Sequence, residues 1–89
     1  MPRVRIARGY VRARRRLPTR IQEASDRALE RFVEDPNRPG LNFERLQGWA
    51  DHYSIRVTRA DRILLRREMD EDGEVFVAVD VGTHRVYRR

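Results

Sequence analysis

Three strand-like runs fill the second half of the chain, and short turns separate them. The runs are residues 53–58, 62–68 and 75–81; the first alternates apolar and polar residues, and the third is almost wholly apolar. The connecting segments are Arg59-Ala-Asp61 and the acidic Asp70-Glu-Asp-Gly73. Alternation indicates a half-buried strand, and short turns join antiparallel neighbours. The pattern predicts a three-stranded meander in which the most apolar run, 75–81, is the central strand of the sheet.

The first half of the chain predicts one strand and two helices. Residues 3–7 alternate basic and apolar side chains, which is typical of a short strand. Apolar residues then recur at helical spacing, which predicts a short helix over about residues 10–17. A longer helix begins where Thr19 and Gln22 are spaced as a capping box, and it ends before Pro36.

These elements predict an α+β fold with the order β-α-α-β-β-β. A chain of 89 residues has room for one domain, so we expect residues 1–89 to form a single unit. The expected arrangement is an N-terminal strand and a helical hairpin packed on one face of a small, mostly antiparallel sheet. The strand residues expected to face the helices are Val4, Ile6, Ile55, Val57, Ile63, Leu65, Val75, Val77, Val79 and Val81.

The charge of the chain predicts an anionic partner. The formal net charge is +6, the isoelectric point is about 11.1, and all 20 basic residues are arginine. Arginine stays ionised at physiological pH, and its planar fork of donors fits phosphate. We therefore expect RNA, DNA or an acidic protein as the partner, and no membrane, because no apolar run approaches the roughly 18 residues that span a bilayer. The absence of cysteine excludes a disulfide scaffold and fits a reducing cytoplasm.

Strand alternation also predicts a cluster of arginines on the sheet face away from the helices. Arg56, Arg62 and Arg66 fall on that face together with Asp80 and, if the last strand continues, His84. Guanidiniums around an imidazole suit a phosphodiester, because arginine stabilises phosphate charge and histidine moves protons near neutral pH. An ordinary solvated surface is the alternative interpretation, since 38% of the residues are charged.

Other side chains are candidates for contact with nucleic acid. The exposed face of the short helix carries four arginines, whose mutual repulsion favours an anionic partner over a role in solubility alone. The predicted nucleic-acid-binding residues are Arg12, Arg14, Arg15, Arg16, Arg66 and Arg85. Tyr87 is expected to stack on a base, bond to phosphate or assist in proton transfer, and it is counted with Arg56, Arg62 and His84 among the catalytic candidates. Trp49 is expected to cover the core, and His52 to be a surface residue.

Several segments of the chain, taken in order, resemble the RelE/ParE toxins of bacterial toxin–antitoxin systems. They cover nearly the whole chain from the first helix onward. These segments are the Leu17-Pro18 break, the run Pro-Gly-Leu-Asn-Phe-Glu-Arg-Leu at 39–46, Tyr53-Ser-Ile-Arg-Val57, Asp61-Arg-Ile-Leu-Leu65, and Asp80-Val-Gly-Thr-His84 with Tyr87. The resemblance implies a helical hairpin against an antiparallel sheet, in agreement with the periodicity.

The resemblance also implies an activity and a set of roles. In the ribonuclease branch of that family, the toxin enters the ribosomal A site, and the 2′-hydroxyl of messenger RNA attacks the adjacent phosphate. Carried over to this sequence, Arg56 and Arg62 bind and neutralise that phosphate, His84 acts as an acid or base, and Tyr87 matches the terminal tyrosine. The resemblance implies a metal-independent endoribonuclease without a cofactor, and Ser54 departs from members that have a basic residue there.

Two alternatives stay open at the level of sequence. The first is the gyrase-poisoning branch, which shares the fold and lacks the nuclease residues. The second is a non-toxic module that binds nucleic acid or a protein partner with the same fold. The family also implies a cognate antitoxin, whose acidic or amphipathic segment would wrap the basic groove. The remaining expected partners are RNA and the ribosome, or DNA gyrase in the first alternative.

Overall fold

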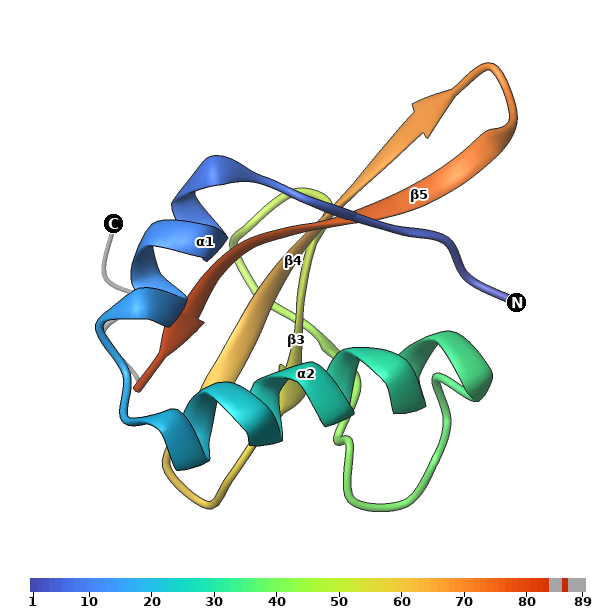
Figure 1. The fold of residues 1–89 in the computed structure, drawn as a ribbon. Helices are drawn as coiled ribbons and strands as arrows, with labels where there is room; N and C mark the ends of the chain where they lie inside the picture. The colour runs from blue at the N-terminus through green and yellow to red at the C-terminus, as the bar shows by residue number, and fades with distance from the viewer. Residues whose placement is uncertain (84–85, 87–89) are drawn as a thin grey trace.

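A mixed five-stranded sheet and two helices make up the fold (Figure 1). The structure is a computed structural model, and it describes residues 1–83 and 86. The elements in chain order are β1 (Val4–Ile6), α1 (Arg8–Arg15), α2 (Thr19–Glu34), β2 (Glu44–Arg45), β3 (His52–Arg56), β4 (Arg62–Asp70) and β5 (Gly73–Gly82). The predicted α+β order is confirmed, with β2 as an additional strand that the sequence did not indicate.

The sheet brings the first and last strands of the chain side by side. The strand order is β1-β5-β4-β3-β2, with β1 parallel to β5 and every other neighbouring pair antiparallel. Val4 is paired with Phe76 and Ile6 with Ala78. The short turns after β3 and β4 account for the antiparallel meander, whereas β1 reaches β5 only through the two helices. The prediction of a mostly antiparallel sheet is confirmed, whereas the predicted central position of the run 75–81 is wrong: β4 is the central strand, and β5 lies between β4 and the edge strand β1.

Pro18 explains where α1 ends and where α2 begins. α1 ends at Arg15, two residues before the predicted end, because Leu17 precedes Pro18 and is biased away from helical geometry. The predicted capping box at Thr19 and Gln22 is wrong. The carbonyl of Pro18 already accepts the N–H groups of Ile21 and Gln22, so Thr19 lies inside α2, and the Gln22 amide donates to the carbonyl of Leu17 instead (2.9 Å).

One face of the sheet packs against both helices and forms the core. Tyr10 of α1 and Ala28 and Phe32 of α2 meet strand residues from β3, β4 and β5. The buried strand residues in this cluster are Ile55, Ile63, Leu65, Phe76, Ala78 and Val81. Rings from distant segments meet edge to face around Phe32, whose centroid lies 5.0 Å from that of Phe43 and 5.3 Å from that of Phe76. Burial on this face therefore fixes where the helices lie.

The predicted core face of β5 is largely wrong. Leu65 pairs with Ala78 but Leu64 pairs with Asp80, so Val79 is an extra residue that shifts the register. The bulge reverses the alternation, and Phe76, Ala78 and Val81 face the helices, whereas Val75, Val77 and Val79 do not belong to that core. Nearly every side chain of the run 75–81 is apolar, so the sequence does not show which side chains face the helices and which face away.

Close approach of α1 to β5 depends on Gly9. A Cβ atom at this position would lie 2.9 Å from the carbonyl oxygen of Val79, closer than real Cβ contacts allow. Glycine therefore lets the helix backbone pack directly against the strand.

The edge strand β1 is only partly covered. Ile6 is on the helix side as predicted but remains 45% exposed, because no strand lies beyond β1. None of the helices in the described part of the chain is long and apolar enough to cross a membrane.

Candidate nucleic-acid interface

The sheet face opposite the helices carries most of the charged strand residues. Residues paired across antiparallel strands point to the same side, so the register assigns the side chains of this face in rows. The rows are Arg56 with Arg62; Glu44, Ser54, Leu64 and Asp80; and His52, Arg66, Val77 and Arg5. We call this surface the arginine face. The register brings Arg56, Arg62 and Arg66 to one side of the sheet.

The middle of the arginine face is buried. Leu64 is 1% exposed and Ser54 4% exposed, although both lie on the side away from the helices. Val77 is equally buried and is flanked across the strands by Arg5 and Arg66. The aliphatic stems of such arginines shield apolar surface while their guanidiniums stay in water. The face is therefore packed at its base and charged at its rim.

Arg56 and Arg62 form the most distinctive pair on this face. They are direct cross-strand partners at the end of β3 and the start of β4, so their Cβ atoms lie about 5 Å apart. Both guanidiniums donate to one backbone oxygen, the carbonyl of Thr58: Arg56 through Nε at 3.3 Å and Arg62 through Nη1 at 3.0 Å. Like charges at this spacing normally repel. A carbonyl fixes them without cancelling their charge, which suits a site that receives an anion.

The turn between β3 and β4 holds that carbonyl in place. The Thr58 hydroxyl donates to the Asp61 carboxylate at 2.6 Å and accepts the backbone N–H groups of Ala60 and Asp61. The Asp61 carbonyl accepts the N–H groups of Val57 and Thr58 and also bonds to Arg62. Asp61 is only 8% exposed, and its carboxylate accepts a hydrogen bond within the turn. The turn thus orients two arginines through a network of its own hydrogen bonds.

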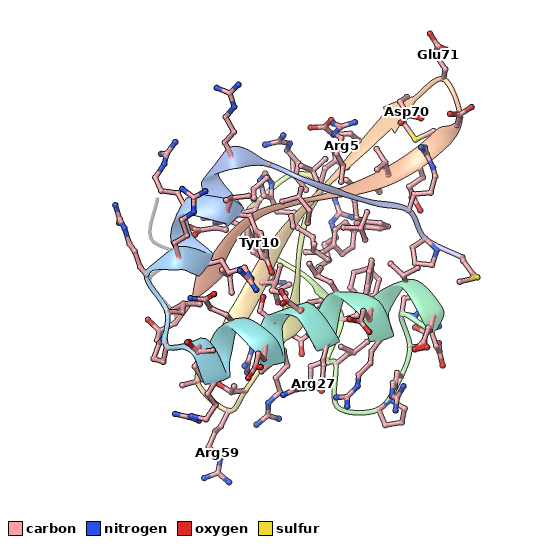
Figure 2. The ribbon with its side chains drawn as sticks, in the orientation of Figure 1. Arg5, Tyr10, Arg27, Arg59, Asp70 and Glu71 are labelled. Atoms are coloured by element: carbon pink, nitrogen blue, oxygen red, sulfur yellow. The ribbon has the colours of Figure 1, made fainter. Side chains whose placement is uncertain are left out.

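Carboxylates neutralise the other arginines of the face. Glu68 receives Arg66 at 2.7 Å and Arg5 at 2.6 Å, from two strands. The hydrogen bond from Arg66, together with that from Arg5, holds the pKa of the Glu68 carboxyl below its usual value. Asp70 receives Arg3 at 2.6 Å, and that hydrogen bond likewise lowers the pKa of Asp70. In Figure 2, Arg5 and Asp70 lie on the far side of the sheet from α2.

The arginines of the first helix do not all face outward. Arg14 binds the Asp26 carboxylate of α2 with two bonds, from Nε at 2.9 Å and from Nη2 at 2.7 Å, so it joins the helices. Arg12, Arg15 and Arg16 are exposed. Arg16 also lines a cavity of about 320 Å³ beside Asp80 and the end of β5. The structure therefore separates Arg14, which has a structural partner, from its three exposed neighbours.

Three predicted site residues lie outside the described residues: His84, Arg85 and Tyr87. Their roles stay predictions from the sequence. Over residues 1–83 and 86, no group of three or more histidine, aspartate and glutamate side chains is arranged to hold a metal ion.

Sequence reasoning missed one imidazole on the arginine face. His52, expected to be an ordinary surface residue, is half-buried and pairs across the strands with Arg66. Its Nδ1 lies 2.7 Å from the carbonyl oxygen of Ala50, and its ring meets that of Trp49 at a centroid distance of 5.2 Å. Trp49 is therefore packed on His52, and it is not among the residues that cover the core, contrary to expectation. Alternate residues of a strand lie on the same face, so the spacing of His52, Ser54 and Arg56 could have placed His52 on the arginine face from the sequence.

Comparison with known proteins depends on structure, because sequence gives no match. No protein-family model matches the chain, and none of the curated proteins matches it either. Solved structures do match over almost their whole length. The YoeB/ParE toxin from Agrobacterium tumefaciens superposes with a TM-score of 0.71 at 16% identity, over 92% of this chain and 98% of that one. The chain has the RelE/ParE toxin fold.

Two further structures with the RelE/ParE fold extend the comparison. The RelBE2 toxin–antitoxin complex from Mycobacterium tuberculosis gives a TM-score of 0.70 at 24% identity, over 94% of this chain and 100% of the matched one. The isolated RelE toxin of E. coli gives 0.67 at 19% identity, over 99% and 93%. The fold that the sequence resemblance implied is thereby confirmed.

Proposed function

We propose that this protein is the toxin of a toxin–antitoxin pair and that it cleaves messenger RNA on the ribosome, in the cytoplasm. The observation that carries the proposal is the Arg56–Arg62 pair. Two permanent positive charges lie side by side on the sheet face away from the helices, held by a carbonyl oxygen. Such a pair is suited to the non-bridging oxygens of a phosphodiester, whose negative charge grows in the transition state. The likeness to RelE/ParE toxins supports the same assignment.

The proposed reaction is an internal transfer at phosphorus. The 2′-hydroxyl oxygen forms a bond to the adjacent phosphorus, the bond from phosphorus to the 5′-oxygen breaks, and a 2′,3′-cyclic phosphate and a 5′-hydroxyl result. One proton leaves the 2′-hydroxyl and one reaches the 5′-oxygen. Arg56 and Arg62 bind the phosphate, and His84 supplies or accepts a proton. Tyr87 binds the adjacent nucleotide by stacking.

A cognate antitoxin is the proposed protein partner. An antitoxin segment that covers the arginine face would block access of RNA to Arg56 and Arg62. The exposed arginines Arg12, Arg15 and Arg16 would extend the surface that RNA or the antitoxin contacts, and the same role is proposed for Arg85 from the sequence alone. Arg14 contributes less, because Asp26 already occupies its guanidinium.

Expression in bacterial cells tests the proposal. We expect growth arrest and new messenger RNA 5′ ends, and we expect Arg62→Ala and His84→Ala to abolish both. Arg27→Ala is the matched control, because Arg27 is an exposed arginine on the outer side of α2 (Figure 2). It removes the same charge away from the arginine face.

The alternatives give different outcomes in the same experiment. A gyrase poison would leave messenger RNA intact and induce the DNA damage response, and His84→Ala would be nearly silent. A non-toxic binding module would cause no growth defect. Cleavage that survives both substitutions would remove the roles assigned to Arg62 and His84.

A further inference from the structure

The loop between β2 and β3 contains a cavity that none of the roles above uses. Its volume is about 410 Å³, and it is lined by the consecutive residues Arg45 to Ala50. Trp49, the one tryptophan of the sequence, is half-buried in this loop. The loop leads directly into His52, the first residue of β3 on the arginine face. The loop therefore joins an open cavity to the face that is proposed to bind phosphate.

The Trp49 and His52 rings are not stacked on each other. The centroids of Trp49 and His52 lie 5.2 Å apart with an interplanar angle of 76°. The rings thus meet edge to face, and the imidazole does not lie parallel on the indole. A flat, uncharged ring that enters the cavity would find an aromatic surface to stack on. Arg45, an exposed arginine that lines the cavity, adds a cation beside it.

The tautomer of His52 follows from its hydrogen bond. Nδ1 lies 2.7 Å from the carbonyl oxygen of Ala50, and a carbonyl can only accept, so Nδ1 carries the proton. In the neutral ring, Nε2 then has a lone pair that can accept a hydrogen bond. Amino and imino groups on the edges of nucleobases are donors of the matching kind. The pair therefore offers both a stacking surface and a polar contact.

We infer that Trp49 and His52 form a nucleobase-binding subsite for single-stranded RNA. This inference rests on the proposed function, because it names where the RNA continues beyond the phosphate bound by Arg56 and Arg62. His52 and Arg56 lie on the same side of β3, four residues or about 14 Å apart along the strand. A single-stranded chain spans that distance within a few nucleotides. Arg66, across from His52, lies beside this route.

The single tryptophan makes the subsite directly measurable. A short, fluorescein-labelled single-stranded RNA is titrated with the full-length chain at low salt. Binding is followed by anisotropy, and unlabelled RNA is used to follow the emission of Trp49. We expect indole quenching that tracks binding. An otherwise identical strand with abasic positions keeps its phosphates, so it should bind more weakly and cause little quenching.

Substitutions separate stacking from folding. Trp49→Ala should weaken RNA binding by roughly tenfold, and Trp49→Phe, which keeps a ring, should restore most of the affinity. His52→Ala should weaken binding by a smaller factor, and His52→Gln, which keeps an acceptor and a donor, should recover it. Urea denaturation of each variant shows that the compared proteins are folded.

The outcomes distinguish this inference from the proposed function. If RNA binds and Arg62→Ala weakens it, but indole emission is unchanged and Trp49→Ala binds normally, the subsite is refuted while the phosphate site stands. If no RNA binds under any condition, the subsite is refuted, and the proposed function is decided separately by messenger RNA cleavage in cells. Quenching by inorganic phosphate alone would also overturn the subsite, because phosphate has no base to stack.

Discussion

At the scale of single residues, the core contains a buried polar pair between the two helices. The Tyr10 hydroxyl and the Ser25 hydroxyl are hydrogen-bonded, and Ser25 is 0% exposed. Figure 2 shows Tyr10 directed from α1 toward the interior. Burial raises the pKa of the Tyr10 hydroxyl, and the bond to Ser25 offsets part of that shift. Each partner depends on the other, because neither has access to water.

Tyr10→Phe should therefore cost about 1–3 kcal/mol, because it leaves the Ser25 hydroxyl buried without its partner. Adding Ser25→Ala should recover part of the loss. A raised folded-state pKa also means that stability is complete below the ordinary tyrosine pKa and falls as pH rises above it. Urea denaturation at neutral and alkaline pH checks both expectations. An alkaline loss attributable to Tyr10 must be absent in Tyr10→Phe; an identical loss in that variant would contradict the assignment.

Glu68 is the residue that most reduces the charge of the arginine face. Glu68→Gln removes the carboxylate that occupies Arg66 and Arg5, so we expect RNA to bind several-fold more tightly at low salt. Glu30→Gln is the matched control, since it changes the net charge equally from an exposed position on α2. Equal effects of the two substitutions in an RNA-binding titration would mean that only total charge matters.

The ion pairs of Glu68 also make stability depend on pH. Because the pKa of Glu68 is lowered, its contribution to stability is present at neutral pH and is lost as pH falls below the ordinary carboxyl range.

At the scale of elements, the turn between β3 and β4 links local hydrogen bonding to the phosphate site. Thr58→Val removes the hydroxyl that bonds to Asp61 and to two backbone N–H groups, so the Thr58 carbonyl should lose its fixed position. We expect a loss of about 1–2 kcal/mol in stability and, at a temperature where the variant is folded, weaker RNA binding. Thr58→Ser keeps the hydroxyl and should behave like the parent. Normal binding by a folded Thr58→Val would show that the turn does not position Arg56 and Arg62.

The elements were predictable from sequence where a local signal exists. Proline and short turns fixed the ends of the helices and the meander, and alternation brought Arg56, Arg62 and Arg66 to one face. The bulge at Val79 was not predictable, because an apolar run gives no measure of which residue lacks a partner. The neutralisation of Arg66 also depends on Arg5, which comes from a strand far away in the sequence. Long-range pairing of this kind leaves no local pattern.

At the scale of the whole molecule, the charge distribution should determine how RNA binding depends on salt. Each phosphate contact on a single strand releases counterions, and the logarithm of the binding constant falls with the logarithm of salt by about 0.7 per contact. Contacts from Arg56 and Arg62 alone predict a slope of about −1.4. Arg62→Ala should reduce the magnitude of the slope by about 0.7, whereas Arg27→Ala should leave it unchanged. A slope near zero for the parent protein would rule out a phosphate-centred interface.

The pairing of β1 with β5 has a consequence for biosynthesis. β1 has β5 as its sheet neighbour, so the hydrogen bonds between the strands of Val4 and Phe76 can form only after β5 has been made. Contacts between such distant segments are slow to form, since a long loop must close first. Nascent chains would therefore lack the complete sheet until β5 has emerged from the ribosome. The arginine face, which is proposed to bind RNA, would therefore be complete only after all five strands have left the ribosome that made them.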